Sequence, residues 1–209
     1  MRRLVTTSLL ILAAAFIAGP SLGAARVGEP APAFTGTDTR GRTHTLDGYK
    51  GKWVVLEWHN EGCPYVVKHY DTGNMQKLQK KAAGDGVVWL TIISSAPGQQ
   101  GHQTADSANA YFARHEAAPT AVLLDPTGTI GRAYDAKTTP HMYIIDPEGR
   151  LVYNGALDEK PTTDKADVPG ATNYVANALA EALAGKAITT AATKPYGCAV
   201  KYATGTEND

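Results

Sequence analysis

Short apolar runs separated by polar breaks define the elements that this chain is expected to form. The run that starts at Trp53 and ends at Trp58 is typical of a buried strand, and the Asn60-Glu61-Gly62 stretch after it has the composition of a turn. The run from Val87 to Ile93 is continuous and rich in β-branched residues, which predicts a central strand buried on both faces. Another strand is predicted at residues 121–124.

Four segments show the apolar spacing or the end signals of helices. The first begins at Cys63 and Pro64, because proline suits a first helical turn, where the amide that it lacks would have no partner. Thr104 and Thr172 are the expected N-caps of the third and fourth helices. The predicted helices span residues 63–70, 74–83, 104–116 and 173–184.

Antiparallel pairing is predicted near both ends of the chain. Residues 141–145 and 151–154 flank a Pro-Gly turn, which is a strong hairpin signal, and residues 42–46 form a short strand after a turn region at 35–41. Residues 161–170 are expected to be a charged loop. Strands that alternate with helices and end in a hairpin and a helix predict an α/β protein, with a central mixed sheet and helices on both faces.

The first 25 residues have the pattern of a secretory signal peptide. Arg2 and Arg3 precede an apolar run at 9–18, and small residues up to Ala25 offer cleavage sites. A retained membrane anchor is the alternative, but the run is shorter than the roughly 20 residues that a span requires. We therefore expect a periplasmic or secreted protein without a stable membrane span after cleavage, in a compartment that permits disulfides.

Composition agrees with one globular domain. The 209 residues are 43% hydrophobic, which is enough for a real core. We place the domain at 26–185 and a C-terminal tail without clear periodicity at 186–209. The formal net charge is zero and no basic patch stands out, so nucleic acid is not an expected partner, and no cofactor is expected.

Cys63 is the first candidate for chemistry, because it lies where a strand ends and a helix begins. The unpaired amides and the positive dipole end of a first helical turn favour a thiolate, so a cysteine there often has a lowered pKa. His59, Lys68 and His69 are close in sequence and could add positive potential. The alternative is a buried structural cysteine, since free cysteine is among the most buried residue types.

The strand, turn, Cys-Pro and helix around Cys63 resemble the thioredoxin superfamily, and more closely its redoxin branch, the alkyl hydroperoxide reductase/thiol-specific antioxidant-like proteins. Thr138-Thr139-Pro140-His141 resembles the cis-proline loop of that superfamily, and residues 27–34 resemble the segment that opens redoxin domains. The resemblance covers residues 27–183. It implies a thioredoxin-like fold and a thiol-dependent oxidoreductase, with a peroxide or a protein disulfide as substrate and a thiol reductant as partner.

This chain departs from the active-site motifs of both thioredoxins and peroxiredoxins. Thioredoxins carry a second cysteine three residues after the first, where this chain has Val66, so no disulfide can form within the turn. Peroxiredoxins carry a threonine or serine three residues before the cysteine and a proline seven before it. Here those positions hold Asn60 and Leu56, so the hydroxyl that would orient a peroxide is missing.

The resemblance implies that Pro64, Thr139 and Pro140 position the substrate. Pro140 is expected to follow a cis peptide bond, with an ordinary trans turn as the alternative. The Thr139-Pro140 loop would lie against Cys63 and leave a backbone edge free to pair with a substrate chain.

Cys198 is the only other cysteine, and Pro195 and Gly197 predict a bend that presents it. It could be a resolving cysteine that attacks an oxidised or mixed-disulfide Cys63. It could instead form a static disulfide, which would stabilise the fold by about 4–5 kcal/mol on the chain-entropy model. Both hypotheses require a disulfide between Cys63 and Cys198.

A non-catalytic metal-binding or assembly factor on the same fold is the competing hypothesis. His59, Cys63, His69 and His141 could converge on a copper ion. The chain has no paired-cysteine motif of metal-site spacing, so we expect no metal ligands and assign Cys63 and Cys198 to catalysis.

Overall fold

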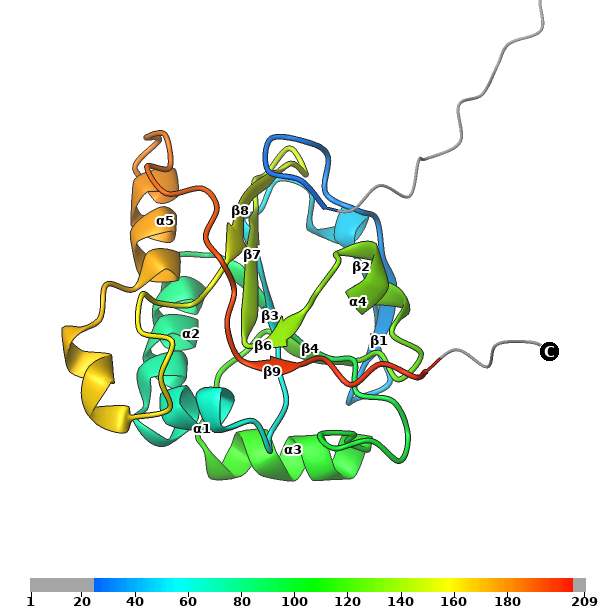
Figure 1. The fold of residues 1–209 in the computed structure, drawn as a ribbon. Coiled ribbons are helices and arrows are strands. Elements are labelled where there is room, and N and C mark those ends of the chain that lie inside the picture. Colours follow the sequence, from blue (N-terminus) through cyan, green and yellow to red (C-terminus); the bar gives the residue numbers. More distant parts are fainter. Residues whose placement is uncertain (1–24, 205–209) are drawn as a thin grey trace, which may run out of the picture.

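The apolar runs become the inner strands of a seven-stranded mixed sheet, in the order β2-β1-β5-β4-β3-β7-β8 (Figure 1). The structure is a computed structural model that describes residues 25–204, so nearly all of the predicted signal peptide lies outside the described residues. Strands β3, β4 and β5 are parallel and the other neighbours are antiparallel. The strands of this sheet are β1 (Thr35–Asp38), β2 (Thr43–Thr45), β3 (Val54–Trp58), β4 (Val88–Ile93), β5 (Ala121–Leu124), β7 (His141–Ile145) and β8 (Leu151–Gly155).

A second, two-stranded sheet pairs β6 (Thr138–Thr139) with β9 (Cys198–Ala199). The segment that follows helix α5 runs past β8 and β7 before it reaches β6 (Figure 1). The tail therefore packs along the domain and does not extend away from it.

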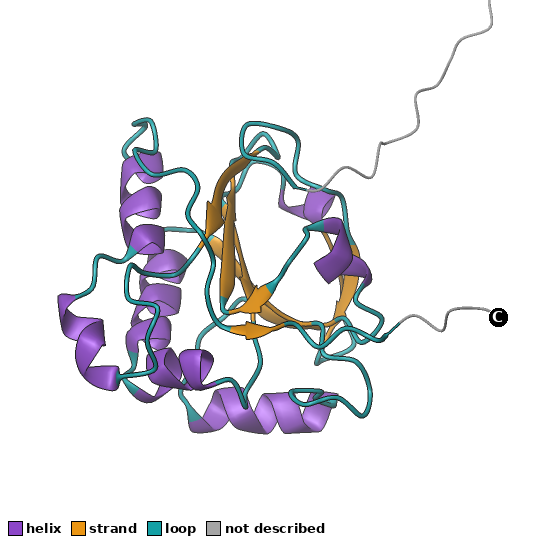
Figure 2. Ribbon diagram, viewed as in Figure 1, coloured by secondary structure: helices purple, strands orange, loops and turns teal. Residues whose placement is uncertain are grey.

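Helices cover both faces of the main sheet, as predicted, but unequally (Figure 2). Helices α1, α2, α3 and α5 pack on one face, and the short helix α4 packs on the other with the N-terminal segment. No helix within residues 25–204 is long and apolar enough to cross a membrane. The helices are α1 (Pro64–Asp71), α2 (Asn74–Gly84), α3 (Ala105–Arg114), α4 (Thr129–Ala133) and α5 (Tyr174–Leu183), with 3-10 turns η1 (Leu46–Tyr49) and η2 (Lys165–Gly170).

Strand β3 is buried on both faces, because its alternate side chains enter two separate cores. Val55 belongs to the core beneath the four helices, whereas Val54, Leu56 and Trp58 belong to the core on the α4 side. This arrangement explains why the run has no polar alternation. It also holds the end of β3, from which the turn before Cys63 begins.

Glu57 is the only charged residue of β3, and its side chain is fully buried. Burial alone would raise its pKa, but the neighbouring His59 and the hydrogen bonds to the carboxylate bring the pKa below its ordinary value. The carboxylate therefore stays ionised and ties β3 to β4, α1 and α2. Its four donors are Tyr70 (2.8 Å), Gln79 (3.2 Å), Trp89 (2.7 Å) and Thr91 (3.0 Å).

Three local predictions were wrong. Thr35–Asp38 is strand β1 rather than a turn, because pairing with β2 and β5 outweighs its weak apolar pattern. The last helix is capped by Asn173 instead of Thr172, since the Asn173 side chain accepts the Ala176 amide at 2.9 Å. The charged loop at 161–170 contains the 3-10 turn η2.

We expect the Glu57→Ala variant to lose about 3–5 kcal/mol of unfolding free energy, because it leaves buried donors without an acceptor. Urea denaturation at pH 7 measures this loss. The matched control is Glu148→Ala on the exposed hairpin turn, which should change stability by less than about 0.5 kcal/mol. Equal losses in the two variants would contradict a structural role for the buried carboxylate.

Candidate active site

Cys63 is the N-cap residue of helix α1, with Pro64 directly after it in the first turn, as the sequence predicted. Its amide donates to the Asn60 carbonyl at 3.1 Å, and its carbonyl accepts the amides of Val66 and Val67 at 2.9 Å each. These bonds fix the backbone on both sides of the sulfur. The side chain makes no cap hydrogen bond, so the thiol is left for other partners.

The Thr139-Pro140 loop supplies one of those partners. The peptide bond before Pro140 is cis, as predicted, and the Cys63 Sγ donates to the Thr139 carbonyl at 3.0 Å. The two segments are 76 positions apart in sequence. The fold thus brings together the turn and the loop that the resemblance singled out.

Cys198 completes the cluster through the small sheet. Strand β9 pairs with β6 so that Cys198 lies opposite Thr139, and Ala199 lies opposite Thr138. Neither Cys63 nor Cys198 is in a disulfide, and the two thiols lie close enough to influence each other's ionisation. Burial first, and then the bond to Cys63 and its charge, raise the pKa of Cys198 to about 12.

This pairing overturns the expectation of a free backbone edge at the Thr139-Pro140 loop. The chain's own tail occupies that edge, because β6 pairs with β9. Cys63 is also completely buried, at 0% exposure, rather than open to solvent. The pairing could not be predicted, because a two-residue strand has no periodicity to detect. The burial of Cys63 agrees with the alternative of a buried cysteine.

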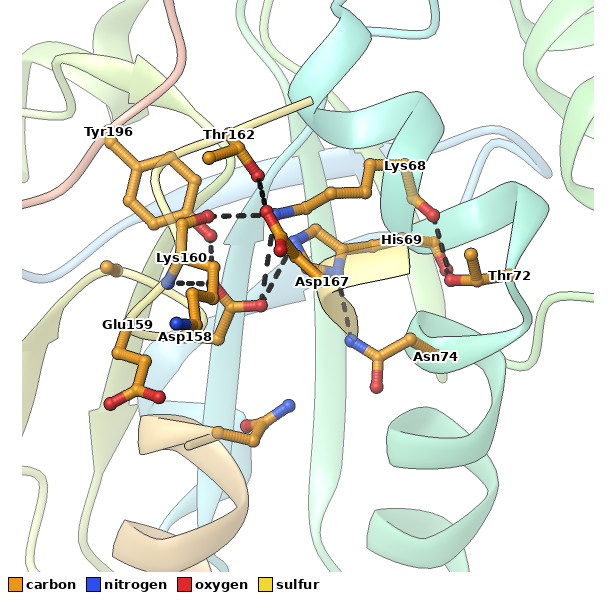
Figure 3. Close-up of polar contacts among 12 residues, drawn as sticks. Lys68, His69, Thr72, Asn74, Asp158, Glu159, Lys160, Thr162, Asp167 and Tyr196 are labelled. Atoms are coloured by element: carbon orange, nitrogen blue, oxygen red, sulfur yellow. Dashed lines mark hydrogen bonds and ion pairs between the residues drawn. The ribbon is translucent and has the colours of Figure 1, made fainter. Parts of the chain in front are cut away.

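A buried polar cluster holds the tail just before Cys198 (Figure 3). Tyr196 donates a short hydrogen bond to Asp158, and its ring packs edge-on against Tyr65 with centroids 5.7 Å apart. The Lys68 ammonium lies 5.5 Å from the centre of the same ring and 4.0 Å from Asp158. We call Lys68, Asp158 and Tyr196 the Tyr196 cluster. It links helix α1, which Cys63 caps, to the tail that carries Cys198.

The charges of the Tyr196 cluster are almost fully shielded from water. The side chains of Lys68 and Asp158 are 0% and 2% exposed. Burial lowers the pKa of Lys68, although Asp158 opposes the shift. Next to them, burial lowers the pKa of His69 to about 4, so that this imidazole is neutral at pH 7. Lys68 also donates to the Lys160 carbonyl at 2.9 Å.

The loop at 94–103 lies beside the turn at 60–62. Asn60 donates to Gln100 at 2.8 Å, and Gln103 donates to Glu61 at 3.0 Å. The loop also contacts the tail, because the Ala96 amide donates to the Lys201 carbonyl at 2.8 Å. The loop therefore supports the turn and the tail together.

The histidines of the metal hypothesis do not gather around Cys63. His59 is enclosed by the rings of Tyr70, Tyr111 and Phe112, each with its centroid 5.0 Å away. His69 contacts Asn74 and Asp158 in the region of the Tyr196 cluster. Across residues 25–204, no group of three or more His, Cys, Asp or Glu side chains is arranged to hold a metal ion.

His141 supports the cis-proline loop through hydrogen bonds. Its Nδ1 accepts from the Lys137 amide (3.2 Å), so its Nε2 carries the proton that is donated to Asn154 (2.8 Å). Burial lowers the pKa of His141 to about 4, because the Asn154 bond offsets only part of the desolvation. A second ring proton, on Nδ1, would have to displace the Lys137 amide.

Sequence analysis missed Glu57, Asp158 and Tyr196. Glu57 could have been found, because a carboxylate within a continuous apolar run signals a buried polar network. Asp158 and Tyr196 are 38 positions apart in segments without regular periodicity, so no local pattern joins them.

Comparison with known proteins places this site in a family context. The model of the AhpC/TSA family matches residues 27–154. The chain is 27% identical over 150 residues to the thiol-disulfide oxidoreductase ResA of Bacillus subtilis (strain 168), covering 70% of this chain and 78% of that protein. It is 24% identical over 135 residues to ResA of Geobacillus kaustophilus (strain HTA426), covering 61% and 68%.

Solved structures with the same fold confirm the thioredoxin-like architecture. A hypothetical protein from Sinorhizobium meliloti 1021 has a TM-score of 0.72 at 24% identity, covering 88% of this chain and 98% of its own. An uncharacterized conserved protein from Geobacillus kaustophilus has a TM-score of 0.70 at 24% identity, covering 86% and 94%. A thiol:disulfide interchange protein from Bacteroides sp. has a TM-score of 0.50 at 20% identity, covering 70% and 88%.

We expect the stability of the protein to fall as the pH drops from about 6.5 to 4, in part because of His141. The folded state holds the pKa of this group near 4, against 6.5 as its ordinary value, so the unfolded chain takes up the proton first. The His141→Gln variant should show a slope that is shallower by up to about 1.4 kcal/mol per pH unit in this window. Urea denaturation across the pH range measures it. Above pH 7 the slopes of the wild type and the variant should be equal. Equal slopes below pH 6 as well would contradict the contribution assigned to His141.

Proposed function

The chain belongs to the AhpC/TSA family, and from this we propose that it is a thiol-disulfide oxidoreductase in which Cys63 is the attacking sulfur. The similarity to two proteins named thiol-disulfide oxidoreductase ResA supports this reaction class. The observation that carries the proposal is the cluster of Cys63, the cis-proline loop and Cys198. It supplies a nucleophile, a positioning loop and a second thiol at one point.

In the first step the Cys63 thiolate attacks one sulfur of a substrate disulfide. The bond formed is a mixed disulfide between Cys63 and that sulfur, and the other substrate sulfur leaves as a thiolate. In the second step Cys198 loses its proton and attacks the Cys63 Sγ. The remaining substrate sulfur then leaves as a thiolate. The substrate disulfide has gained two electrons, and Cys63 and Cys198 have become a disulfide.

The pKa of Cys198 suggests why the steps occur in this order. Burial is the main cause of its high pKa, but the hydrogen bond to Cys63 and the charge on Cys63 add to it. Formation of the mixed disulfide removes that charge and the thiol partner. Cys198 then ionises more readily at the stage where it must attack. Before that stage it stays a thiol and does not compete as a nucleophile.

Thr139, Pro140 and Pro64 position the substrate in this scheme. The Thr139 carbonyl orients the Cys63 thiol, and Pro64 opens the helix without adding an amide donor. A disulfide is the proposed substrate, and a thiol reductant returns the Cys63–Cys198 disulfide to two thiols. The signal-like pattern in residues 1–25 supports export to the periplasm or beyond, where such disulfides persist.

Peroxide reduction is the second candidate, which family membership favours. The Cys63 thiolate would attack one peroxide oxygen, giving a sulfenic acid and an alcohol or water. Cys198 would then displace water to form the same disulfide. The lack of a hydroxyl at position 60, which would orient a peroxide, weighs against it.

We expect the Cys63→Ser variant to abolish exchange with glutathione disulfide, and the Cys198→Ser variant to stop at one glutathione adduct on Cys63. The reason is that the first lacks the nucleophile and the second lacks the resolving thiol. Mass spectrometry of reduced protein after exposure to glutathione disulfide reads both outcomes.

Wild-type protein is the control and should lose two hydrogens in mass without a lasting adduct. Exchange that survives in Cys63→Ser would refute the assignment of the nucleophile. Rapid oxidation of Cys63 by hydrogen peroxide, without reaction toward disulfides, would instead favour the second candidate.

A further inference from the structure

The backbone edge of β6 is the natural place for a substrate chain, because an unpaired strand edge next to a reactive sulfur can bind an extended peptide. In this protein β9 pairs along that edge at both β6 positions. The Val200 amide continues the contact by donating to the Lys137 carbonyl at 3.0 Å. The tail thus takes the position that an extended substrate would need.

Gly197 brings the tail so close to β6 that no second chain fits between them. Its φ is +137°, in a region that favours glycine, and a Cβ built there would overlap the Thr139 carbonyl. The Thr139 oxygen is the same atom that accepts the Cys63 thiol. A peptide could pair with Thr139 only after the tail had moved.

Side-chain contacts hold the tail on both sides of Gly197. Before Gly197, the Tyr196 cluster holds it to helix α1 through Asp158 and Lys68. After Ala199, the Tyr202 hydroxyl donates to the Ala136 carbonyl at 2.8 Å. The Arg132 guanidinium lies 4.6 Å from the centre of the Tyr202 ring. Displacement of the tail therefore costs several contacts at once.

We propose that residues 196–200 act as a specificity element that closes the β6 edge to polypeptide disulfides, so that Cys63 exchanges preferentially with disulfides of low mass. The inference rests on the proposed function, because it concerns which disulfides reach Cys63. A small disulfide does not have to pair with β6 in order to react with the Cys63 Sγ. A polypeptide must also take over the edge that β9 occupies.

Two probes with the same reacting group test this proposal. Both are mixed disulfides with 2-nitro-5-thiobenzoate, one of N-acetylcysteine amide and one of an extended peptide with a single central cysteine. The Cys63 thiolate forms a disulfide with the cysteine sulfur, and the coloured thiobenzoate leaves with the electron pair of the broken bond. A Cys198→Ser background stops the reaction at this stage, so the release of colour reports the first exchange alone.

In the Cys198→Ser background we expect the small probe to react at least about tenfold faster than the peptide probe. Adding Gly197→Ala should reduce this gap between the two rates by about tenfold. The added methyl group must push the tail away from Thr139, at the expense of about one backbone hydrogen bond. Gly170→Ala is the matched control, since a Cβ there meets nothing within 4 Å, and it should leave the gap unchanged.

Tyr196→Phe is the second variant and protects the test against a poorly folded Gly197→Ala protein. It keeps the ring against Tyr65 but loses the bond to Asp158, so it should also narrow the gap, by a smaller factor. Equal rates for the two probes in the Cys198→Ser background, or a gap that neither variant narrows, would overturn the specificity role and leave the proposed function standing. Absence of reaction with either probe in any variant would overturn the proposed function and the specificity role together.

Discussion

The hydrogen bond from the Cys63 thiol to the Thr139 carbonyl is the contact at which three remote parts of the chain meet. It joins the end of β3 and the start of α1 to the loop before β7, and β9 lies against the same loop. Each part depends on a different support. The buried Glu57 network holds β3, His141 holds the loop, and the Tyr196 cluster holds the tail. The sulfur is positioned by the whole domain rather than by its helix alone.

Sequence patterns predicted the parts of the fold that depend on continuous burial. Strand β4 and the β7–β8 hairpin have strong local signals, so their position and type were correct. Strand β1 was missed because Thr35-Gly36-Thr37-Asp38 has no large apolar residue and becomes a strand only by pairing with two neighbours. The fold class followed from element order, which is less sensitive to such errors than any single boundary.

Only the parts of the candidate site that have a sequence motif could be predicted. The Cys-Pro turn and the cis-proline loop have recognisable sequences, and the structure brings them together. The closure of that loop by β9 depends on a pairing between positions 139 and 198, which no local pattern encodes. Lys68 illustrates the same limit, because it was considered a source of positive potential for Cys63 and instead enters a buried pair with Asp158. A buried ion pair contributes little net stability but restricts the geometry of its neighbours, which suits a contact that must place one thiol beside another.

Three glycines of the domain lie directly against the tail. A Cβ at Gly128 or Gly131 would overlap the Tyr202 ring, and one at Gly155 would overlap Thr193. Gly128 and Gly131 lie inside the segment matched by the family model, which ends at residue 154, whereas Tyr202 and Thr193 lie well beyond it. A segment outside the matched range therefore packs against residues within it. Removal of the tail would leave the space beside these glycines unfilled and expose the β6 edge at Thr139.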